Sequence, residues 1–248
     1  MSINPLICYL RPKDIPEVLT EMEKIPCDKL YINYICYPYP HRIARDYFLS
    51  HPEYTHLMII PNDLVVTRKD YERMIDNISK YPMLDVLCGV CNVDLDQEKD
   101  YWAICHNLPD LGGMNYNWYK SSLRDVLQGR IIRVPFAGMP FMVMARHVIE
   151  GLTNELSRPG YDGTDLFGKE GYATDVYLCH NLWNFHIPIY CDTGIEMLHL
   201  RYKYEMQVGK KSPSCELHTQ DKVLNVTDEC YKLINVTQNE IRERCKSV

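Results

Sequence analysis

The sequence lacks any long hydrophobic run. No stretch approaches the roughly 18 consecutive apolar residues that a membrane-spanning helix needs. The N-terminal stretch MSINPLICYLRPKD also lacks the basic region and the long apolar core of a secretion signal. We therefore expect a cytoplasmic protein with no membrane span.

A surplus of positive charge is missing as well. The chain has 248 residues, with 27 Lys and Arg against 33 Asp and Glu, which gives a net charge of −6. Binding to nucleic acid requires cations that neutralise phosphates, so we expect no nucleic-acid partner. Hydrophobic residues make up 46% and charged residues 24% of the chain, as in ordinary globular proteins. The length suits one large α/β domain, with or without a C-terminal appendage.

Eleven cysteines are present, but the pattern of a zinc site is absent. Cys88 and Cys91 form a C-x-x-C inside an apolar run that predicts a strand, where these two side chains would point to opposite faces. No second pair with similar spacing follows. We expect the cysteines to be buried thiols of the core. The regular spacing of Cys215, Cys230 and Cys245 is interpreted as a coincidence.

The first third of the chain alternates between two kinds of segment. Thr67 and Asp70 match a capping box with Asp in place of Glu, which predicts that a helix begins at residue 68. Alternation of strands and helices is typical of a parallel sheet with crossover helices, so we predict an α/β fold. The predicted strands are 6–10, 29–36, 55–60 and 85–91, and the predicted helices are 13–25, 41–50 and 68–81.

The middle of the chain is less regular. Residues 92–135 are rich in aromatic residues, Gly and Asn, and we expect a long functional loop there. A strand passing into a short helix is predicted at 141–152, and another helix is predicted to begin at Thr174 as its N-cap. Two further strands, 187–193 and 195–200, are expected to complete the sheet.

The chain beyond residue 201 is more polar. We divide the sequence into a main domain, 1–201, and a helical C-terminal extension, 202–248. One helix of the extension is predicted to begin near Thr227. The other is predicted near Thr237, which forms a capping box with Glu240.

A carboxylate follows directly after one predicted strand. The stretch HLMIIPND places Asp63 where the strand 55–60 ends, and ligands of open α/β sheets bind outside the carboxyl ends of the strands. A carboxylate there can hold a divalent cation, which in turn can hold a diphosphate. The alternative is that Asn62 and Asp63 simply form a turn.

Three further segments accompany this strand end, in a fixed order along the chain. They are PFAGMPFMVMARHVIEGL, GKEGYATDVYLCHNLWNFHIPIYCDT and IEMLHLR. Together with HLMIIPND they resemble the GT-A glycosyltransferases, particularly the sugar transferases related to cellulose and chitin synthases. The resemblance covers residues 5–201 and implies a Rossmann-like, mixed but mostly parallel sheet flanked by helices.

The resemblance implies a metal and a catalytic base. Asp63 matches the aspartate of the family's metal motif, and His199 matches its late metal-coordinating histidine, so Mn²⁺ or Mg²⁺ is the expected cofactor. Asp175 matches the residue that takes the proton of the acceptor hydroxyl in inverting members. Two positions depart from the pattern, because Asn62 stands where a second acid is usual and Thr174 stands where Glu is usual. From the residues alone, Asp175 could instead cap its helix, and His199 could be a core histidine.

The resemblance also implies a site for a UDP- or GDP-linked sugar donor. The exit of the first strand, with Tyr9 and Arg11, lies where the family binds the nucleotide, and Gly138 matches a glycine that allows close approach. Arg45 is a candidate for contact with phosphate, or else a surface charge. The acceptor is unknown, with a glycan as one class. Aromatic side chains that could stack on it, or simply pack within their loop, are Trp102, Tyr116, Trp118 and Tyr119.

We therefore predict a metal-dependent glycosyltransferase. One alternative is a GT-A-like protein that binds a nucleotide or glycan without turnover, which the departures at Asn62 and Thr174 favour. Another alternative is a sugar nucleotidyltransferase. That class has a glycine-rich loop after its first strand, whereas NPLICYLRPKD contains no glycine.

Overall fold

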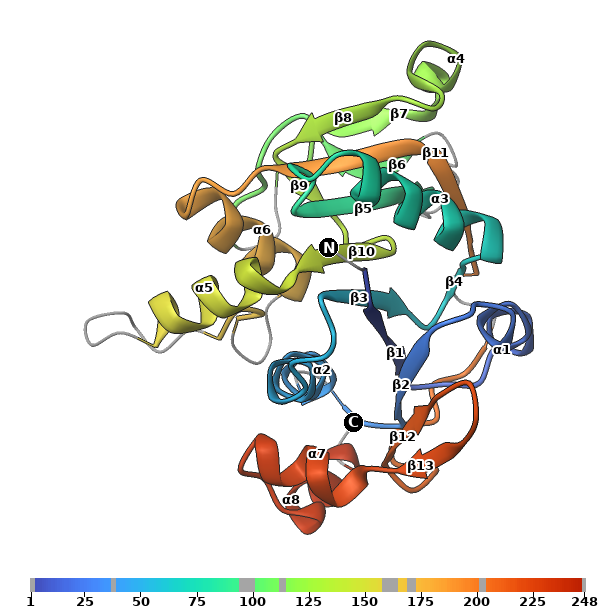
Figure 1. Ribbon diagram of the computed structural model, residues 1–248, viewed down its shortest axis with the longest axis vertical. Helices are drawn as coiled ribbons and strands as arrows, with labels where there is room; N and C mark the ends of the chain where they lie inside the picture. Colours follow the sequence, from blue (N-terminus) through green and yellow to red (C-terminus); the bar gives the residue numbers. More distant parts are fainter. Residues whose placement is uncertain are drawn as a thin grey trace.

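The computed structural model describes residues 3–36, 39–93, 101–111, 115–157, 165–168, 173–200 and 204–246. A large sheet forms the centre of the molecule, and helices cover both of its faces (Figure 1). None of the helices in these ranges is long and apolar enough to cross a membrane.

In the described ranges the sheet contains ten strands. They are β1 (Pro5–Arg11), β2 (Asp28–Asn33), β3 (His56–Pro61), β4 (Leu64–Val65), β5 (Val86–Cys91), β8 (Ile131–Val134), β10 (Met142–Ala145), β11 (Ile189–His199), β12 (Ser214–His218) and β13 (Val223–Asn225). Their order is β13-β12-β2-β1-β3-β10-β5-β11-β4, and β8 pairs with β11 beside this path.

The sheet is mixed, as the resemblance implies, whereas the alternating segments alone predict a parallel sheet. Strand β1 runs parallel to β2 and β3, and β11 runs parallel to β5. Strand β10 lies antiparallel between β3 and β5. Strands β1, β3, β5 and β11 therefore share one direction, and their carboxyl ends lie at the same edge of the sheet.

One prediction about the last strands of the main domain is wrong. The two strands expected at 187–193 and 195–200 are a single long strand, β11, whose pairing with β5 shifts in register between Cys191 and Glu196. This irregularity lets one strand continue past the end of β5 and pair with β4. His199 is the last residue of β11.

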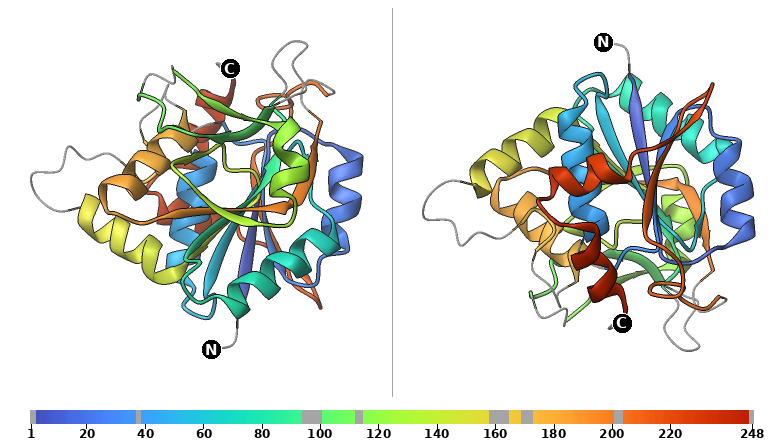
Figure 2. Two further views of the ribbon diagram at one scale, coloured as in Figure 1. Left: turned by 90° about the horizontal axis from the view of Figure 1, so that it is seen from above. Right: turned by 90° about the horizontal axis from the view of Figure 1, so that it is seen from below.

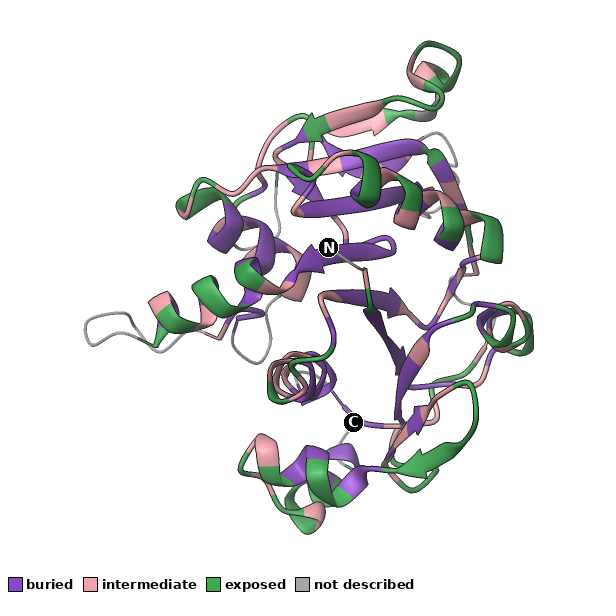
Figure 3. Cartoon of the chain, viewed as in Figure 1, coloured by how far each residue is buried: buried purple, intermediate pink, exposed green. Residues whose placement is uncertain are grey.

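The helices form two layers. Helices α1 (Pro16–Glu23) and α3 (Arg68–Lys80) pack on one face of the sheet, as Figure 2 shows. The other face carries α2 (Tyr39–Ser50), α5 (Arg146–Leu156), α6 (Thr174–Asn184), α7 (Thr227–Leu233) and α8 (Gln238–Lys246). Both faces of the central strands are consequently apolar and buried (Figure 3).

The start of α3 confirms a prediction made from two residues. Asp70 donates its backbone N–H to the Thr67 hydroxyl at 3.2 Å, and its carboxylate accepts the backbone N–H of Thr67 at 2.9 Å. This reciprocal pair satisfies two backbone donors that a helix start leaves free. It fixes where the chain turns after the β3–β4 corner that carries Asp63.

The region 92–135 is more ordered than the sequence analysis predicts. Its described residues form β8, β6 (Tyr101–Cys105) and β7 (Trp118–Lys120), and β6 also pairs with β9 (Phe136–Ala137), which follows this region, so that a small sheet has the order β7-β6-β9. A short 3₁₀ turn, η1 (Ser121–Leu123), and the short helix α4 (Arg124–Leu127) follow β7. Strands this short show too little alternation of apolar and polar residues to be recognised.

The C-terminal extension is not purely helical. Its two helices begin near the predicted positions, and Thr237 and Glu240 form the expected capping box. Before them, however, β12 pairs antiparallel with β2 and β13 pairs with β12. The extension therefore lengthens the main sheet, and α7 packs on α2. Its cysteines, Cys215, Cys230 and Cys245, are buried in the same core cluster, so their positions reflect packing.

Candidate functional site

Polar side chains gather at the carboxyl edge of the sheet. Asn62 and Asp63 follow β3, Asn92 follows β5, and His199 ends β11. Because these three strands run in the same direction, their ends place all four side chains at one edge. The topology thus brings together residues that are far apart in the sequence, where an open α/β sheet binds its ligands.

Asp63 and His199 are direct neighbours. The Nε2 atom of His199 lies 3.5 Å from a carboxylate oxygen of Asp63. The pairing of β11 with β4 creates this contact, because it sets His199 opposite Leu64. The backbone N–H of Leu200 also donates to the Asp63 carbonyl at 2.7 Å. The structure therefore places the two predicted metal ligands side by side.

The hydrogen bonds of His199 show that this pair needs a positive charge. Its Nδ1 atom lies 3.0 Å from the backbone carbonyl of Asn92, which can only accept, so Nδ1 carries a proton. In a neutral ring, Nε2 would then turn a lone pair toward the carboxylate of Asp63. The contact is favourable only if Nε2 is protonated or a metal ion lies between the two groups.

Electrostatics keep Asp63 ionised. Burial alone would raise the pKa of this carboxyl. The hydrogen bond and charge of His199, together with the charge of Lys13, outweigh burial and lower the pKa below its ordinary value. Lys13 is almost fully buried just beyond the end of β1. A carboxylate that stays charged at neutral pH is suited to bind a cation.

Two buried polar atoms at this edge have no hydrogen-bond partner among the described residues. They are Nδ2 of Asn62 and Oδ1 of Asn92. Asn62 is only 7% exposed. Unpaired buried amides are costly, which makes them candidates for contact with a bound ligand.

Tyr9 supports this edge from beneath. It is fully buried, and its hydroxyl donates to the backbone carbonyl of Asn62 at 3.1 Å. Burial raises the pKa of the Tyr9 hydroxyl far above its ordinary value. A side chain enclosed in this way does not reach a donor nucleotide. The predicted direct contact is therefore replaced by a supporting role, in which Tyr9 fixes the backbone before Asp63.

Gly138 and Asp175 also lie together at the carboxyl edge. Strand β10 begins at Met142, opposite Ile59 near the end of β3, so the residues just before it lie beyond that end. A Cβ atom added to Gly138 would sit 3.6 Å from a carboxylate oxygen of Asp175. A side chain at Gly138 would thus lie in contact with the predicted base and with Ala103.

The start of α6 beside Asp175 differs from the prediction that Thr174 is its N-cap. The N-cap of α6 is Ala173, without a side-chain cap, and Thr174 is already helical. Burial raises the pKa of Asp175, although its carboxylate accepts the backbone N–H of Val176 at 2.9 Å. Desolvation outweighs the hydrogen bonds from the backbone. Burial and then the charge of Asp175 raise the pKa of Tyr116 to about 12, which places this ring nearby.

The two predicted phosphate-binding arginines are already paired with carboxylates. Arg11 ends β1, and its Nε donates to Asp14 at 2.8 Å. Arg45 lies on α2 and contacts Asp46 at 2.6 Å and Asp165 at 2.8 Å. Arg11 remains at the carboxyl edge. The structure does not bring Arg45 to the Asp63 site, because two acidic groups hold its guanidinium elsewhere.

The four aromatic residues predicted as candidates for stacking on an acceptor differ in burial. Trp102 is fully buried and belongs to the core, so it cannot stack on an acceptor. The rings of Tyr116 and Trp118 are only partly buried and stack on each other at 4.5 Å with an angle of 4°. Tyr119 stacks on His106 at 3.5 Å. The pair formed by Tyr116 and Trp118 is the remaining candidate for a sugar platform.

Asn92 and Lys13 were missed in the sequence analysis. Both stand just beyond the carboxyl end of a strand, which is the signal that identified Asp63. No group of three or more His, Cys, Asp or Glu side chains in the described ranges could hold a metal ion. Asp63 and His199 alone are thus fewer side chains than such a group contains.

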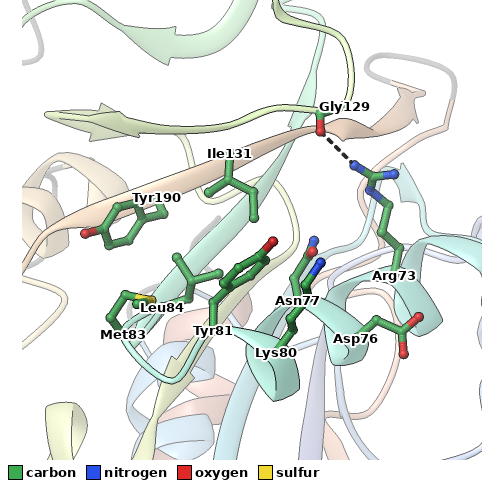
Figure 4. A pocket seen from close by; sticks show the side chains of 10 residues that line it. All are labelled: Arg73, Asp76, Asn77, Lys80, Tyr81, Met83, Leu84, Gly129, Ile131 and Tyr190. Carbon is green, nitrogen blue, oxygen red and sulfur yellow. Dashed lines mark hydrogen bonds between the residues drawn. The ribbon is translucent and has the colours of Figure 1, made fainter.

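A large cavity lies away from this edge. It has a volume of about 850 Å³ and is bounded by α3, the loop before β5 and the starts of β8 and β11 (Figure 4). Beside it, Arg73 and Asn77 reach across to Asp192, which is fully buried. None of the predicted site residues lines this cavity. Its lining is Arg73, Asp76, Asn77, Lys80, Tyr81, Met83, Leu84, Gly129, Ile131 and Tyr190.

Comparisons with known proteins bear on the fold alone. No protein-family profile and no curated protein matches the chain. Among solved structures, it is similar to the crystal structure of A197 from STIV, with a TM-score of 0.50 and 15% sequence identity. The match covers 92% of this chain and 91% of that one. The arrangement of elements is thus shared over nearly the whole length.

Proposed function

We propose that the protein is a glycosyltransferase that moves a sugar from a nucleoside diphosphate donor to an acceptor hydroxyl. The observation that carries this proposal is the contact between Asp63 and His199, which a divalent cation at the carboxyl edge of the sheet would satisfy. The unpaired amides of Asn62 and Asn92 add further groups for a ligand at that edge.

The residues at this edge suit a divalent metal. A carboxylate oxygen of Asp63 and Nε2 of His199 would hold Mn²⁺ or Mg²⁺, and the Nδ1 hydrogen bond to Asn92 would orient the ring. When bound, such an ion neutralises the charge that develops on a departing diphosphate. The side-chain amide of Asn62 is a donor beside the same position and can bind a phosphate oxygen.

Asp175 is proposed as the general base. Its raised pKa makes it a stronger proton acceptor than an ordinary aspartate as long as it remains ionised. Because Gly138 has no side chain to lie against this carboxylate, an acceptor hydroxyl could approach it there. The stacked rings of Tyr116 and Trp118 offer an apolar face to the acceptor sugar. Asp175 would then take the hydroxyl proton as the acceptor oxygen bonds to the donor carbon and the bond from that carbon to the diphosphate oxygen breaks, which releases the nucleoside diphosphate.

A second function is favoured by one departure from the family pattern. Asn62 stands where a second acid is usual, so the protein offers a single carboxylate at the metal position. A protein of this kind could bind a nucleotide or glycan without turnover. Hydrolysis of UDP- and GDP-linked sugars with Mn²⁺ separates the two functions, since a binding protein releases no free sugar.

Calorimetry tests the site itself. We expect UDP or GDP to bind in Mn²⁺ and to lose most of its affinity in EDTA, and Asp63→Ala to abolish the metal-dependent part. Asp76→Ala is the control, because Asp76 is an exposed carboxylate at the cavity of Figure 4, away from the carboxyl edge. Metal-dependent binding that is unchanged in Asp63→Ala would contradict the proposal.

A further inference from the structure

Two cysteines from opposite ends of the chain meet in the core. Cys36 follows β2, and Cys245 lies in the last turn of α8. Their sulfur atoms are 3.0 Å apart, which is only about 1 Å longer than a disulfide bond. The backbone N–H of Cys36 also donates to the sulfur of Cys245 at 3.1 Å. Both side chains are at least nine-tenths buried.

We propose that Cys36 and Cys245 are a disulfide-forming pair that fixes helix α8 to the loop after β2. This inference does not depend on the proposed function. Helix α8 buries only two side chains, Ile241 and Cys245. It can therefore detach from the core more easily than the strands of the sheet can. A disulfide bond at Cys245 would fix one of these two buried side chains covalently.

The segment before β12 depends on the same helix end. Gly209 has a φ of +75°, and a Cβ added to it would collide with the backbone carbonyl of Cys245. From this segment, Gln207 donates its backbone N–H to Pro12 at 2.9 Å, and Lys211 forms an ion pair with Asp14. A bond at Cys245 would thus hold the segment over the carboxyl ends of β1 and β2.

The reaction needs an oxidant, and we assign this role to a small-molecule disulfide such as glutathione disulfide. Burial and the neighbouring Cys245 raise the pKa of the Cys36 thiol to about 12, which keeps it protonated in the closed protein. When α8 loosens, the thiolate of Cys245 attacks the small disulfide and releases one glutathione thiolate. Cys36 then gives up its proton, attacks the mixed disulfide and releases the second glutathione. Two thiols become one disulfide, and one glutathione disulfide becomes two glutathiones.

Other cysteine pairs of the chain are placed differently. Cys88 and Cys191 stand opposite each other on the neighbouring parallel strands β5 and β11, and both are fully buried. Cys215 and Cys230 bring β12 and α7 together within the core. Neither pair includes a residue on a helix that buries as few side chains as α8. We therefore expect Cys36 and Cys245 to oxidise first.

Peptide mapping of the full chain tests the proposal without any variant. The protein is incubated with excess glutathione disulfide, alkylated and digested with trypsin. Trypsin cuts after Lys29, Arg42, Arg244 and Lys246, so the expected product is peptide 30–42 joined to peptide 245–246. Recovery of both cysteines as alkylated thiols, or of either one only as its glutathione adduct, would overturn the proposal.

Melting temperature gives a second readout. Oxidation should raise it by about 5 °C or more, and dithiothreitol should reverse the gain. Cys245→Ser should lose this response. Cys27→Ser should keep it, because Cys27 is a buried thiol next to Tyr71 and Lys29. An equal response in Cys245→Ser and in the wild-type protein would also overturn the proposal.

Discussion

Two polar centres of this molecule contrast with each other. At the carboxyl edge, the contact between Asp63 and His199 is favourable only with a proton on Nε2 or a metal ion between the two groups. Two nearby amide atoms have no hydrogen-bond partner in the part of the chain that the structure describes. Arg73 and Asn77, which line the cavity of Figure 4, donate hydrogen bonds to Asp192, which is fully buried. One of its oxygens accepts from Arg73 at 2.9 Å and from the backbone of Gly194 at 2.8 Å, and the other accepts from Arg73 at 2.7 Å and Asn77 at 2.5 Å.

This difference distinguishes a polar centre that stabilises the fold from one that can bind a ligand. A buried carboxylate with all its hydrogen bonds made stabilises one conformation and offers nothing to a ligand. A centre with unpaired groups bears an energetic cost that a bound ligand can offset. By this criterion the carboxyl edge is the better candidate site, although the cavity beside Asp192 is spacious. The following predictions test that distinction.

The largest effect is expected for Asp175→Asn, which keeps the shape of the side chain and removes its basicity. Transfer per folded molecule should fall by about 10²–10⁴-fold, the usual contribution of a general base. Donor binding should be unchanged. Turnover within threefold of wild type, or a product with retained anomeric configuration, would rule out this role for Asp175.

The pKa of Asp175 also predicts how the melting temperature of Asp175→Asn, relative to wild type, changes with pH. The folded-state pKa of Asp175 is raised, so its contribution to stability is complete below the unfolded pKa of about 3.9 and is lost as the pH rises through the folded value. At neutral pH the wild-type protein therefore bears the cost of a buried charge. Asp175→Asn should melt at the same or a higher temperature there, and the difference should shrink on acidification. A helix cap would instead make the variant melt lower at neutral pH.

The second effect concerns the satisfied centre. Asp192→Ala leaves the guanidinium of Arg73 and the amide of Asn77 without their acceptor, and should cost about 3 kcal/mol of unfolding free energy. Chemical denaturation measures this loss, with Asp76→Ala as the exposed control. Metal-dependent nucleotide binding by the folded fraction should stay unchanged. A selective loss of nucleotide binding in Asp192→Ala would mean that this centre belongs to the site.

A third, smaller effect follows from completing the carboxyl edge. Asn62→Asp adds a second acid next to Asp63 and should increase the affinity for Mn²⁺ by about tenfold, because a nearby negative charge strengthens cation binding. Without metal, the variant should be less stable, since two close carboxylates repel each other. Titration with Mn²⁺ and melting in EDTA measure the two effects. Equal Mn²⁺ affinity in the variant and the wild type would place the metal away from Asn62.

The smallest effect concerns Asp63, whose contribution to stability changes with pH in the opposite direction to that of Asp175. The folded-state pKa of Asp63 is lowered, so its contribution is present above the unfolded pKa of about 3.9 and is lost as the pH falls through the folded value. We expect Asp63→Asn, measured without metal, to remove a stabilisation on the order of 1 kcal/mol at neutral pH. The difference between variant and wild type should disappear in acid. A constant difference at all pH values would mean that packing, and not charge, links Asp63 to the fold.

Much of the architecture follows from local patterns in the sequence. Alternation of β-rich and helical segments predicted the parallel strands, and the pair of Thr67 and Asp70 predicted where α3 begins. The proximity of Asp63 and His199 follows from one rule, because residues that end parallel strands meet at one edge. Asn92 obeys the same rule and could have been found in this way.

The remaining features depend on distant parts of the chain. Arg45 looks like a free cation until Asp165 approaches it from another segment. The sign of the pKa shift of Asp175 depends on burial, which no local pattern reports. Strand β12 directs only Cys215 and Leu217 inward, and β13 is exposed along its length, so neither has the apolar run that marks a strand.

The pairing of β12 with β2 has a consequence for how the chain folds. Strand β2 is made early, but its outer edge stays open until residues 214–218 have been synthesised. An open strand edge can pair with other chains, and contacts between such distant residues form slowly. The newly made N-terminal part is therefore prone to aggregate until these residues pair with β2. A chaperone that shields the β2 edge would be needed most during that interval.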